Sequence, residues 1–247
     1  MRALSGAVRT MLTLVAAWQA IVWLVAPPRY ILPAPLDVIA VFPRQWRHLL
    51  DHTLVTTGEI AAGFAAGTLL GIATALAVAA LPRFGRMVWP LVLVLQAFPV
   101  FVLAPVLVLW FGFGMASKVV MTTLIIFFPV ASAFADGLRR IDPEILDATA
   151  LTSASRWQAL VHVRAPLALP ALISGLRVAA PLAPLGAVVG EWVGASAGLG
   201  FVMIQANARM QTDTVFAAMA ILAVLTLALR RAVDALAPRL TPWAQER

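Results

Sequence analysis

Two carboxylates stand in apolar surroundings and have the clearest potential for chemistry. Glu59 precedes the run Ile60-Ala61-Ala62, and Glu191 follows the run 187–190, which is made only of alanine, valine and glycine. An ionisable group in such a setting commonly faces the interior of a helix bundle and serves a transport pathway. Glu59 could do so, or it could lie near enough to a surface to stay hydrated. Glu191, beside a glycine-rich stretch, could line an outer gate or meet a protein from outside.

Gln96 and Pro99 form a second candidate for a pathway. Proline lacks a backbone N–H, so Pro99 frees a carbonyl group that a neighbouring helix or a cavity must satisfy. Gln96 could line the pathway beside it, or it could bond across to another helix.

Catalytic and metal chemistry find no support in the residue spacing. His48 and His52 are four residues apart, but no third ligand lies near them, so we expect a solvated pair rather than a metal site. The chain has no cysteine, which excludes disulfides and thiolate metal sites. Its single lysine, Lys118, follows no glycine-rich loop, so no nucleotide-binding P-loop is present. An intramembrane enzyme would need paired acids or a Ser–His pair in its apolar segments. We therefore predict no catalytic residue, no metal site and no cofactor bound by this chain.

The amino-acid composition indicates whether these residues lie in a soluble protein or in a membrane protein. Hydrophobic residues make up 62% of the 247 residues and charged residues only 12%, about half the usual share of a soluble domain. The mean hydropathy is +0.94. We therefore expect one all-α, polytopic membrane domain over residues 1–247. The net charge of +7 indicates basic loops of a membrane protein rather than nucleic acid as a partner.

Six segments are long and apolar enough to cross a bilayer as helices, which takes ~20 residues. The first is expected to be a spanning helix rather than a cleaved signal, because no small-residue cleavage site follows it. Residues 27–52, between the first two segments, could form an amphipathic helix on the outer surface. The six predicted spans are 10–26, 53–80, 88–111, 117–136, 171–190 and 214–232.

The basic residues predict the orientation. With both termini inside, twelve arginines fall in inner segments, and four arginines and Lys118, five basic residues in all, fall in outer segments. Cytoplasmic loops carry an excess of Lys and Arg, so both termini are predicted to be cytoplasmic. The same count places residues 142–170 on the cytoplasmic side.

Residues 142–170, DPEILDATALTSASRWQALVHVRAPLALP, are unusually polar for this chain. Asp142 and Pro143 predict a helix start, and Ser155 with Gln158 has the spacing of a capping box for a second short helix. Pro166 and Pro170 are expected to end that helix. The pair could be a loop packed under its own bundle, or a knob that docks a cytoplasmic partner. The small residues Ser153, Ala154 and Ser155 at the turn would allow close approach.

This stretch resembles the "EAA" coupling segment of ATP-binding-cassette importer permeases. The motif falls on Asp147-Ala148-Thr149, followed after three residues by Ser153, then by Ala165-Pro166 and Pro170. Asp147 stands where glutamate is usual and Ser153 where glycine is usual. Since serine lacks the conformational freedom of glycine, the turn is expected to differ in detail.

The resemblance covers most of the chain and implies a type I importer permease fold in a bacterial inner membrane. It also implies a homodimer, a separate ATPase that binds ATP and Mg²⁺ and receives the coupling helices, and an extracytoplasmic binding protein. A self-sufficient channel or secondary transporter is the alternative of a different class. That class often shows internal repeats, and none is evident here.

Two further stretches are similar to the nitrate/sulfonate/taurine branch of the family. They are QAFPVFVLAPVLVLWFGFG (96–114) and the segment from Gly186 to Met219. They are most similar to permeases for thiamine precursors of the hydroxymethylpyrimidine type, which implies such a solute. Permeases for sulfonate, taurine, nitrate or riboflavin are the alternatives.

Overall fold

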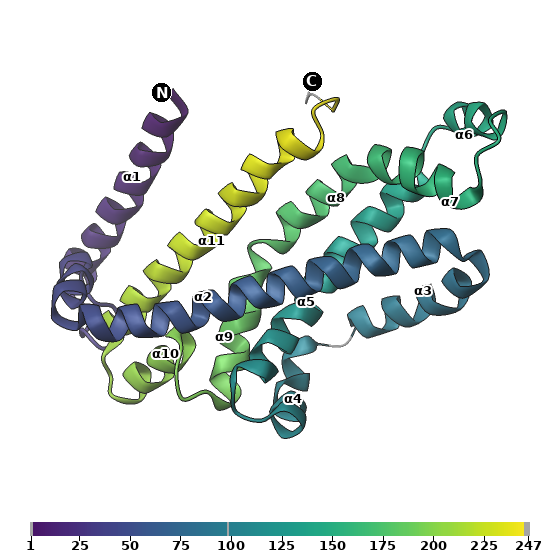
Figure 1. Cartoon of the computed structure of the whole chain (residues 1–247). Coiled ribbons are helices and arrows are strands. Elements are labelled where there is room, and N and C mark those ends of the chain that lie inside the picture. The colour runs from purple at the N-terminus through teal and green to yellow at the C-terminus, as the bar shows by residue number, and fades with distance from the viewer. Residues whose placement is uncertain (1, 98, 245–247) are drawn as a thin grey trace.

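The computed structural model describes residues 2–97 and 99–244, and every regular element within them is a helix (Figure 1). This agrees with a chain that must satisfy its backbone hydrogen bonds without help from lipid. The elements are α1 (Arg2–Val25), α2 (Pro35–Ala80), α3 (Pro82–Ala97), η1 (Val100–Leu103), α4 (Ala104–Phe111), α5 (Met115–Arg139), α6 (Pro143–Ala150), α7 (Arg156–Ala159), η2 (Leu160–Arg164), α8 (Ala165–Ala179), α9 (Leu182–Gly194), α10 (Leu199–Ala208) and α11 (Thr212–Leu240).

Five of the helical stretches are long and apolar enough to span a membrane, and a sixth span results if the bent pair α9–α10 is counted as one. The five are α1, α2, α5, the continuous helix from Arg156 to Ala179, and α11. The all-α, polytopic fold class is therefore confirmed.

Two of the six predicted spans are wrong as continuous helices. The predicted span 88–111 is divided, because α3 ends at Ala97 and α4 begins at Ala104 after the short η1 turn. The predicted span 171–190 contains a break at Ala180–Pro181, between α8 and α9. In both places there is a proline, which has no backbone N–H to donate to a helix, and hydropathy alone does not register this.

The amphipathic segment expected within residues 27–52 is helical but not separate. It forms the first part of α2, a helix of 46 residues that is far longer than a bilayer is thick. Pro43 lies inside this helix, and Gln45 has non-helical dihedral angles (φ −124°, ψ 25°). The kink sets the leading part of α2 at an angle to the spanning part. Val38 and Val41 of the leading part pack with Trp18, with Val202 and with Leu49, which follows the kink.

Helix α5 is the centre of the bundle, and glycines on its neighbours let their backbones approach it. Gly63, Gly67 and Gly71 recur every four residues on α2 and face α5. A Cβ atom added at Gly67 would lie 2.6 Å from the Cβ atom of Ile126. Small residues at this spacing are typical of tight helix pairs in membranes. The α2–α5 pair therefore forms the rigid core of the fold.

The ends of the chain and the polar helix pair α6–α7 lie toward the same side. In Figure 1 both termini and α6–α7 lie along the upper edge, whereas α4 and α10 lie along the lower edge. The protein therefore presents two chemically different ends: the α6–α7 pair at one, and the α9–α10 bend at the other.

Candidate functional site

The helix pair α6–α7 forms through the end-capping residues that the sequence indicated. Asp142 caps α6 by accepting a hydrogen bond of 2.9 Å from the backbone N–H of Glu144. At α7 the backbone N–H of Gln158 donates to Ser155 Oγ (3.2 Å), and the N–H of Ser155 donates to Gln158 Oε1 (2.8 Å). Both predicted helix starts are confirmed.

The turn between the two helices is built by threonine rather than by glycine. Thr152 Oγ1 donates to the carbonyl oxygen of Thr149 (2.7 Å) and accepts from the N–H of Ala154 (3.3 Å). Among the residues that the structure describes, only Ala26 and Met210 are non-glycine residues with positive φ. Ser153 therefore sits in the turn without backbone strain.

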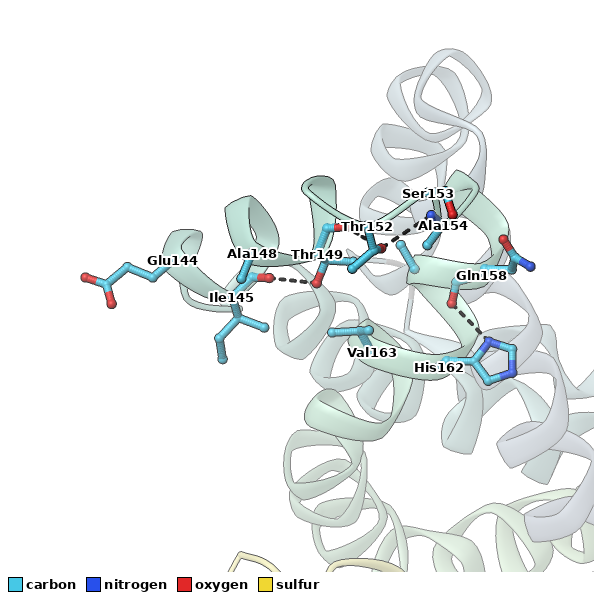
Figure 2. Close-up of a pocket in the computed structure, with 11 residues that line it drawn as sticks. Glu144, Ile145, Ala148, Thr149, Thr152, Ser153, Ala154, Gln158, His162 and Val163 are labelled. Atoms are coloured by element: carbon cyan, nitrogen blue, oxygen red, sulfur yellow. Dashed lines mark hydrogen bonds between the residues drawn. The ribbon is translucent and has the colours of Figure 1, made fainter.

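A concave surface of about 790 Å³ lies between α6 and α7. Figure 2 shows Ala148, Thr149, Ser153 and Ala154 around it, together with side chains from both helices. Asp147 and Ser155 are exposed on the same helix pair, and Leu151 at its tip has 91% of its surface exposed. The structure thus gathers most of the predicted coupling residues on one projecting surface.

The prediction that Pro166 and Pro170 end the second helix is wrong. The chain stays helical from Arg156 to Ala179, with one π-helical turn at Leu160–Arg164. In that turn the N–H of Ala165 donates to the carbonyl oxygen of Leu160, five residues back. Pro166 has no backbone N–H to donate to the preceding turn, and the wider π-helical turn accommodates this without ending the helix. Pro166 therefore lies at the start of α8 and Pro170 inside it, and neither lines the concave surface between α6 and α7.

A second polar site, buried, lies near the opposite end of the molecule. Glu191, at the end of α9, is 1% exposed and accepts hydrogen bonds from the Thr56 hydroxyl (2.6 Å) and from the N–H of Gly200. Thr56 Oγ1 also accepts from the N–H of Leu199 (2.8 Å). The carboxylate thus holds the glycine-rich turn between α9 and α10 against α2.

Glycine is required in this turn. Gly198 has φ of +109°, a conformation that side chains rarely adopt, and a Cβ atom there would collide with the Glu191 carboxylate. Its N–H donates to Nδ1 of His52 across 2.9 Å. His52 is therefore partly buried and bonded, which corrects the expectation that it is a solvated residue.

Glu59 and Lys118 complete the buried polar cluster. Glu59 has 2% of its surface exposed, which rules out the hydrated position considered for it. Its carboxyl group interacts with the carboxyl group of Glu191 and with the ammonium group of Lys118. Lys118 is 1% exposed, and its Nζ donates to the carbonyl oxygens of Phe113 (2.6 Å) and Gly194 (2.7 Å). We define Thr56, Glu59, Lys118 and Glu191 as the latch cluster. It joins α2, α5 and α9.

Gln96 and Pro99 are not part of this cluster. Both are exposed, at the end of α3 and at the break before η1. Lys118 and Thr56 were missed as functional candidates. Lys118 could have been identified from the sequence, because a lysine inside an otherwise apolar span indicates a functional position. A single threonine such as Thr56 gives no such signal.

Comparison with known proteins identifies the chain. The family described as "Binding-protein-dependent transport system inner membrane component" matches residues 67–242. The chain belongs to this family. This permease is 47% identical to a probable ABC transporter permease protein of Haemophilus influenzae, with 90% of each chain covered.

Two further relatives carry substrate names. The permease is 36% identical to the riboflavin transport system permease protein RibX of Chloroflexus aurantiacus, covering 95% of this chain and 88% of the relative. It is 33% identical to the formylaminopyrimidine transport permease protein ThiX of Halalkalibacterium halodurans, covering 95% and 94%.

A solved structure shares the fold of the permease. The inward-facing MetNI methionine ABC transporter matches with a TM-score of 0.64 at 20% identity, over 81% of this chain and 98% of that one. The permease is thus a multi-pass inner-membrane subunit of an ABC importer. Its family implies a separate ATPase and a substrate-binding protein as partners.

Proposed function

We propose that two copies of this permease form the membrane pathway of an importer and that each copy docks an ATPase through α6–α7. The projecting α6–α7 surface is the observation that carries this proposal. Both helices are capped, the turn is unstrained, and the concave face includes small side chains at Ala148, Ser153 and Ala154. The residues in contact with the ATPase are Asp147, Ala148, Thr149, Ser153, Ala154 and Ser155. ATP and Mg²⁺ bind the ATPase, and both termini of the permease face the cytoplasm.

The rigid connection behind this surface supports a coupling role. The helix that begins at Arg156 continues without interruption to Ala179, and α8 packs along α5 in the core. A displacement of α7 by the ATPase is therefore carried into the membrane by one continuous helix. A flexible loop at this place would dissipate such a displacement.

Bulky substitution on the α6–α7 pair tests the docking role. Ala154→Trp and Asp147→Trp are expected to uncouple ATP hydrolysis from uptake in the reconstituted complex, because they obstruct the surface without touching the bundle. Ala208→Trp, at an exposed residue on the end of α10, is the matched control. Normal assembly and transport by both Trp variants of α6–α7 would show that the surface docks nothing.

For the substrate, we propose a thiamine precursor of the hydroxymethylpyrimidine class. The similarity of segments 96–114 and 186–219 to such permeases supports it, as does the relative named for formylaminopyrimidine. Riboflavin is the second candidate, favoured by the relative named for it. Both are planar nitrogen heterocycles, and a sulfonate such as taurine is chemically unlike either.

The cognate binding protein decides among these substrates. Calorimetric titration with hydroxymethylpyrimidine, formylaminopyrimidine, riboflavin and taurine is expected to give tight binding of a pyrimidine only. Uptake of the same compound by the reconstituted complex checks the assignment. Tight binding of riboflavin or taurine instead would replace the proposed substrate but leave the ABC permease role intact.

The latch cluster is proposed as part of the outer gate, with Glu59 and Glu191 as its acidic members. Its carboxylates and Lys118 fix the α9–α10 bend against α2 and α5, where the pathway would open outward. Gln96 and Pro99, at the break between α3 and η1, are proposed to line the pathway itself. Glu191→Gln is expected to change the rate of uptake at unchanged ATPase docking.

A further inference from the structure

A cavity of about 450 Å³ lies at the end of the bundle that carries α7 and η2. The end of α2, the start of α3, the end of α5 and η2 form its walls. Arg86, Arg139 and Arg164 line it from three different elements, together with Trp89. No acidic residue is among the described residues that line it. Three arginines that line one cavity, without an acidic residue beside them in its wall, favour an anionic occupant.

Arg139 and Arg164 are held in place but not neutralised, and Arg86 is exposed. Arg164 Nη2 donates to the carbonyl oxygen of Leu138 (2.8 Å), while its Nε is buried and has no hydrogen-bond partner. The Arg139 guanidinium lies 4.7 Å from the ring centroid of Trp89. Asp136 lies 3.9 Å from Arg139 Nη1, but both side chains are half-exposed, and such an ion pair is weak. The cavity therefore retains positive charge and at least one unused buried donor.

A second, mostly apolar groove of about 840 Å³ adjoins this cavity. The two share Ala79, Pro82 and Arg164 as lining residues. Leu76, Leu81 and Trp157 are among the side chains in the groove. An arginine-lined cavity next to an apolar groove suits a molecule with an anionic head and an apolar chain.

We propose that Arg86, Arg139 and Arg164 form a binding site for a phosphate group. Guanidinium groups bind phosphate oxygens through paired, charge-assisted hydrogen bonds, and basic pockets between transmembrane helices bind anionic lipid headgroups. The phosphate can come from an anionic phospholipid, with one acyl chain along Leu76, Leu81 and Trp157. It can also come from free phosphate in solution.

Occupation of this site would tie α3 to the coupling region. Arg86 belongs to α3, whereas Arg164 belongs to the π-helical turn that continues α7. A bound phosphate would bridge these two elements, between which the described residues show no hydrogen bond or ion pair. The anion would therefore stabilise the placement of α7 for its partner.

The test uses the permease purified with its ATPase in nanodiscs of phosphatidylcholine, with or without phosphatidylglycerol. Phosphatidylglycerol is expected to raise the melting midpoint of the permease and to remain bound in native mass spectra. In the variant Arg86→Gln/Arg139→Gln we expect roughly five-fold weaker binding for each arginine removed. Arg164 is left intact, because its substitution would also break the bond to Leu138.

The matched control is Arg83→Gln/Arg140→Gln, which removes two exposed arginines that line neither the cavity nor the groove. It should keep the response to phosphatidylglycerol. Inorganic phosphate added to phosphatidylcholine nanodiscs distinguishes the sources: an equal shift with phosphate alone assigns the site to free phosphate. Absence of any shift with either anion, or an equal shift in Arg86→Gln/Arg139→Gln, would overturn the proposal.

Discussion

The ammonium of Lys118 lies 2.7 Å from the carbonyl oxygen of Gly194, the last residue of α9. Its other bond, 2.6 Å to the carbonyl oxygen of Phe113, reaches the loop before α5. One buried cation therefore closes the C-terminal end of α9, where free carbonyls carry partial negative charge. Since Glu191 belongs to the same helix end and accepts from α10, the α9–α10 bend is fixed from both sides.

Replacing Lys118 by methionine is expected to destabilise the permease strongly. Methionine keeps the apolar volume but leaves the carbonyl oxygens of Phe113 and Gly194 without this donor, and it leaves the buried carboxyl groups of Glu59 and Glu191 without a cation. The loss should be about 3 kcal/mol, a fall of roughly 6–12 °C in the melting midpoint. Thermal unfolding of the purified permease in detergent measures it.

Arg209→Met is the control for this change, because Arg209 is exposed and bonds only to Gln205 among the described side chains. It should leave the midpoint within about 2 °C. If Lys118→Met is as stable as Arg209→Met, the hydrogen bonds of Lys118 do not hold the bend.

Thr56→Val removes the hydroxyl that connects α2 with the α9–α10 turn and keeps the shape of the side chain. It leaves the Leu199 N–H without its acceptor and Glu191 without one donor. We expect a loss of about 1–2 kcal/mol, since hydrogen bonds between membrane helices are individually modest. Hydrogen exchange at residues 196–202 should increase in this variant.

Thr53→Val provides the comparison, because the Thr53 hydroxyl bonds only the carbonyl of Leu49 in its own helix among the described residues. Exchange at the turn should stay as in the unmodified protein. Equal exchange at residues 196–202 in both variants would mean that Thr56 does not anchor the turn.

Much of this architecture can be predicted from the sequence, because apolar segments, the distribution of arginines and helix-capping residues each depend only on residues close together in the chain. The starts of α6 and α7 follow from Asp142 and Ser155, whose partners lie within three residues. The latch cluster is different, since Thr56 and Glu191 are separated by 135 positions and meet only after α2, α5 and α9 have packed. The break between α3 and α4 and the break at Ala180–Pro181 were missed because their flanks are as apolar as the spans.

Gly63, Gly67 and Gly71 of α2 are four residues apart in the sequence, but this spacing does not reveal that they face α5. Gly67→Ala places a Cβ atom 2.6 Å from Ile126 Cβ and 2.8 Å from the carbonyl oxygen of Thr123. Because the backbone at Thr123 cannot move aside as a flexible side chain can, α2 and α5 must move apart to accommodate the added Cβ atom. We expect a loss of about 1–3 kcal/mol and a reduced yield of folded protein.

Gly58→Ala is the matched substitution on the same helix. Its nearest neighbour would be the flexible end of Met115, at 3.3 Å. This variant should fold as well as the unmodified protein, measured by size-exclusion chromatography after extraction. A normal elution profile for Gly67→Ala would show that the α2–α5 contact is looser than the structure has it.

The turn between α6 and α7 gives the sharpest contrast between two neighbouring serines. Ser155 accepts from the N–H of Gln158, so Ser155→Ala removes the cap of α7 and should cost about 1 kcal/mol locally. Ser153→Gly introduces the glycine that the resemblance to the "EAA" coupling segment leads us to expect at this position. Because Ser153 needs no positive φ, glycine adds only flexibility, and the cost is about 0.5–1 kcal/mol without any gain in transport. Hydrogen exchange over residues 150–160, with the ratio of ATP hydrolysed to solute imported, measures both. If Ser153→Gly instead improved that ratio, the unstrained turn would not be the form that the ATPase engages.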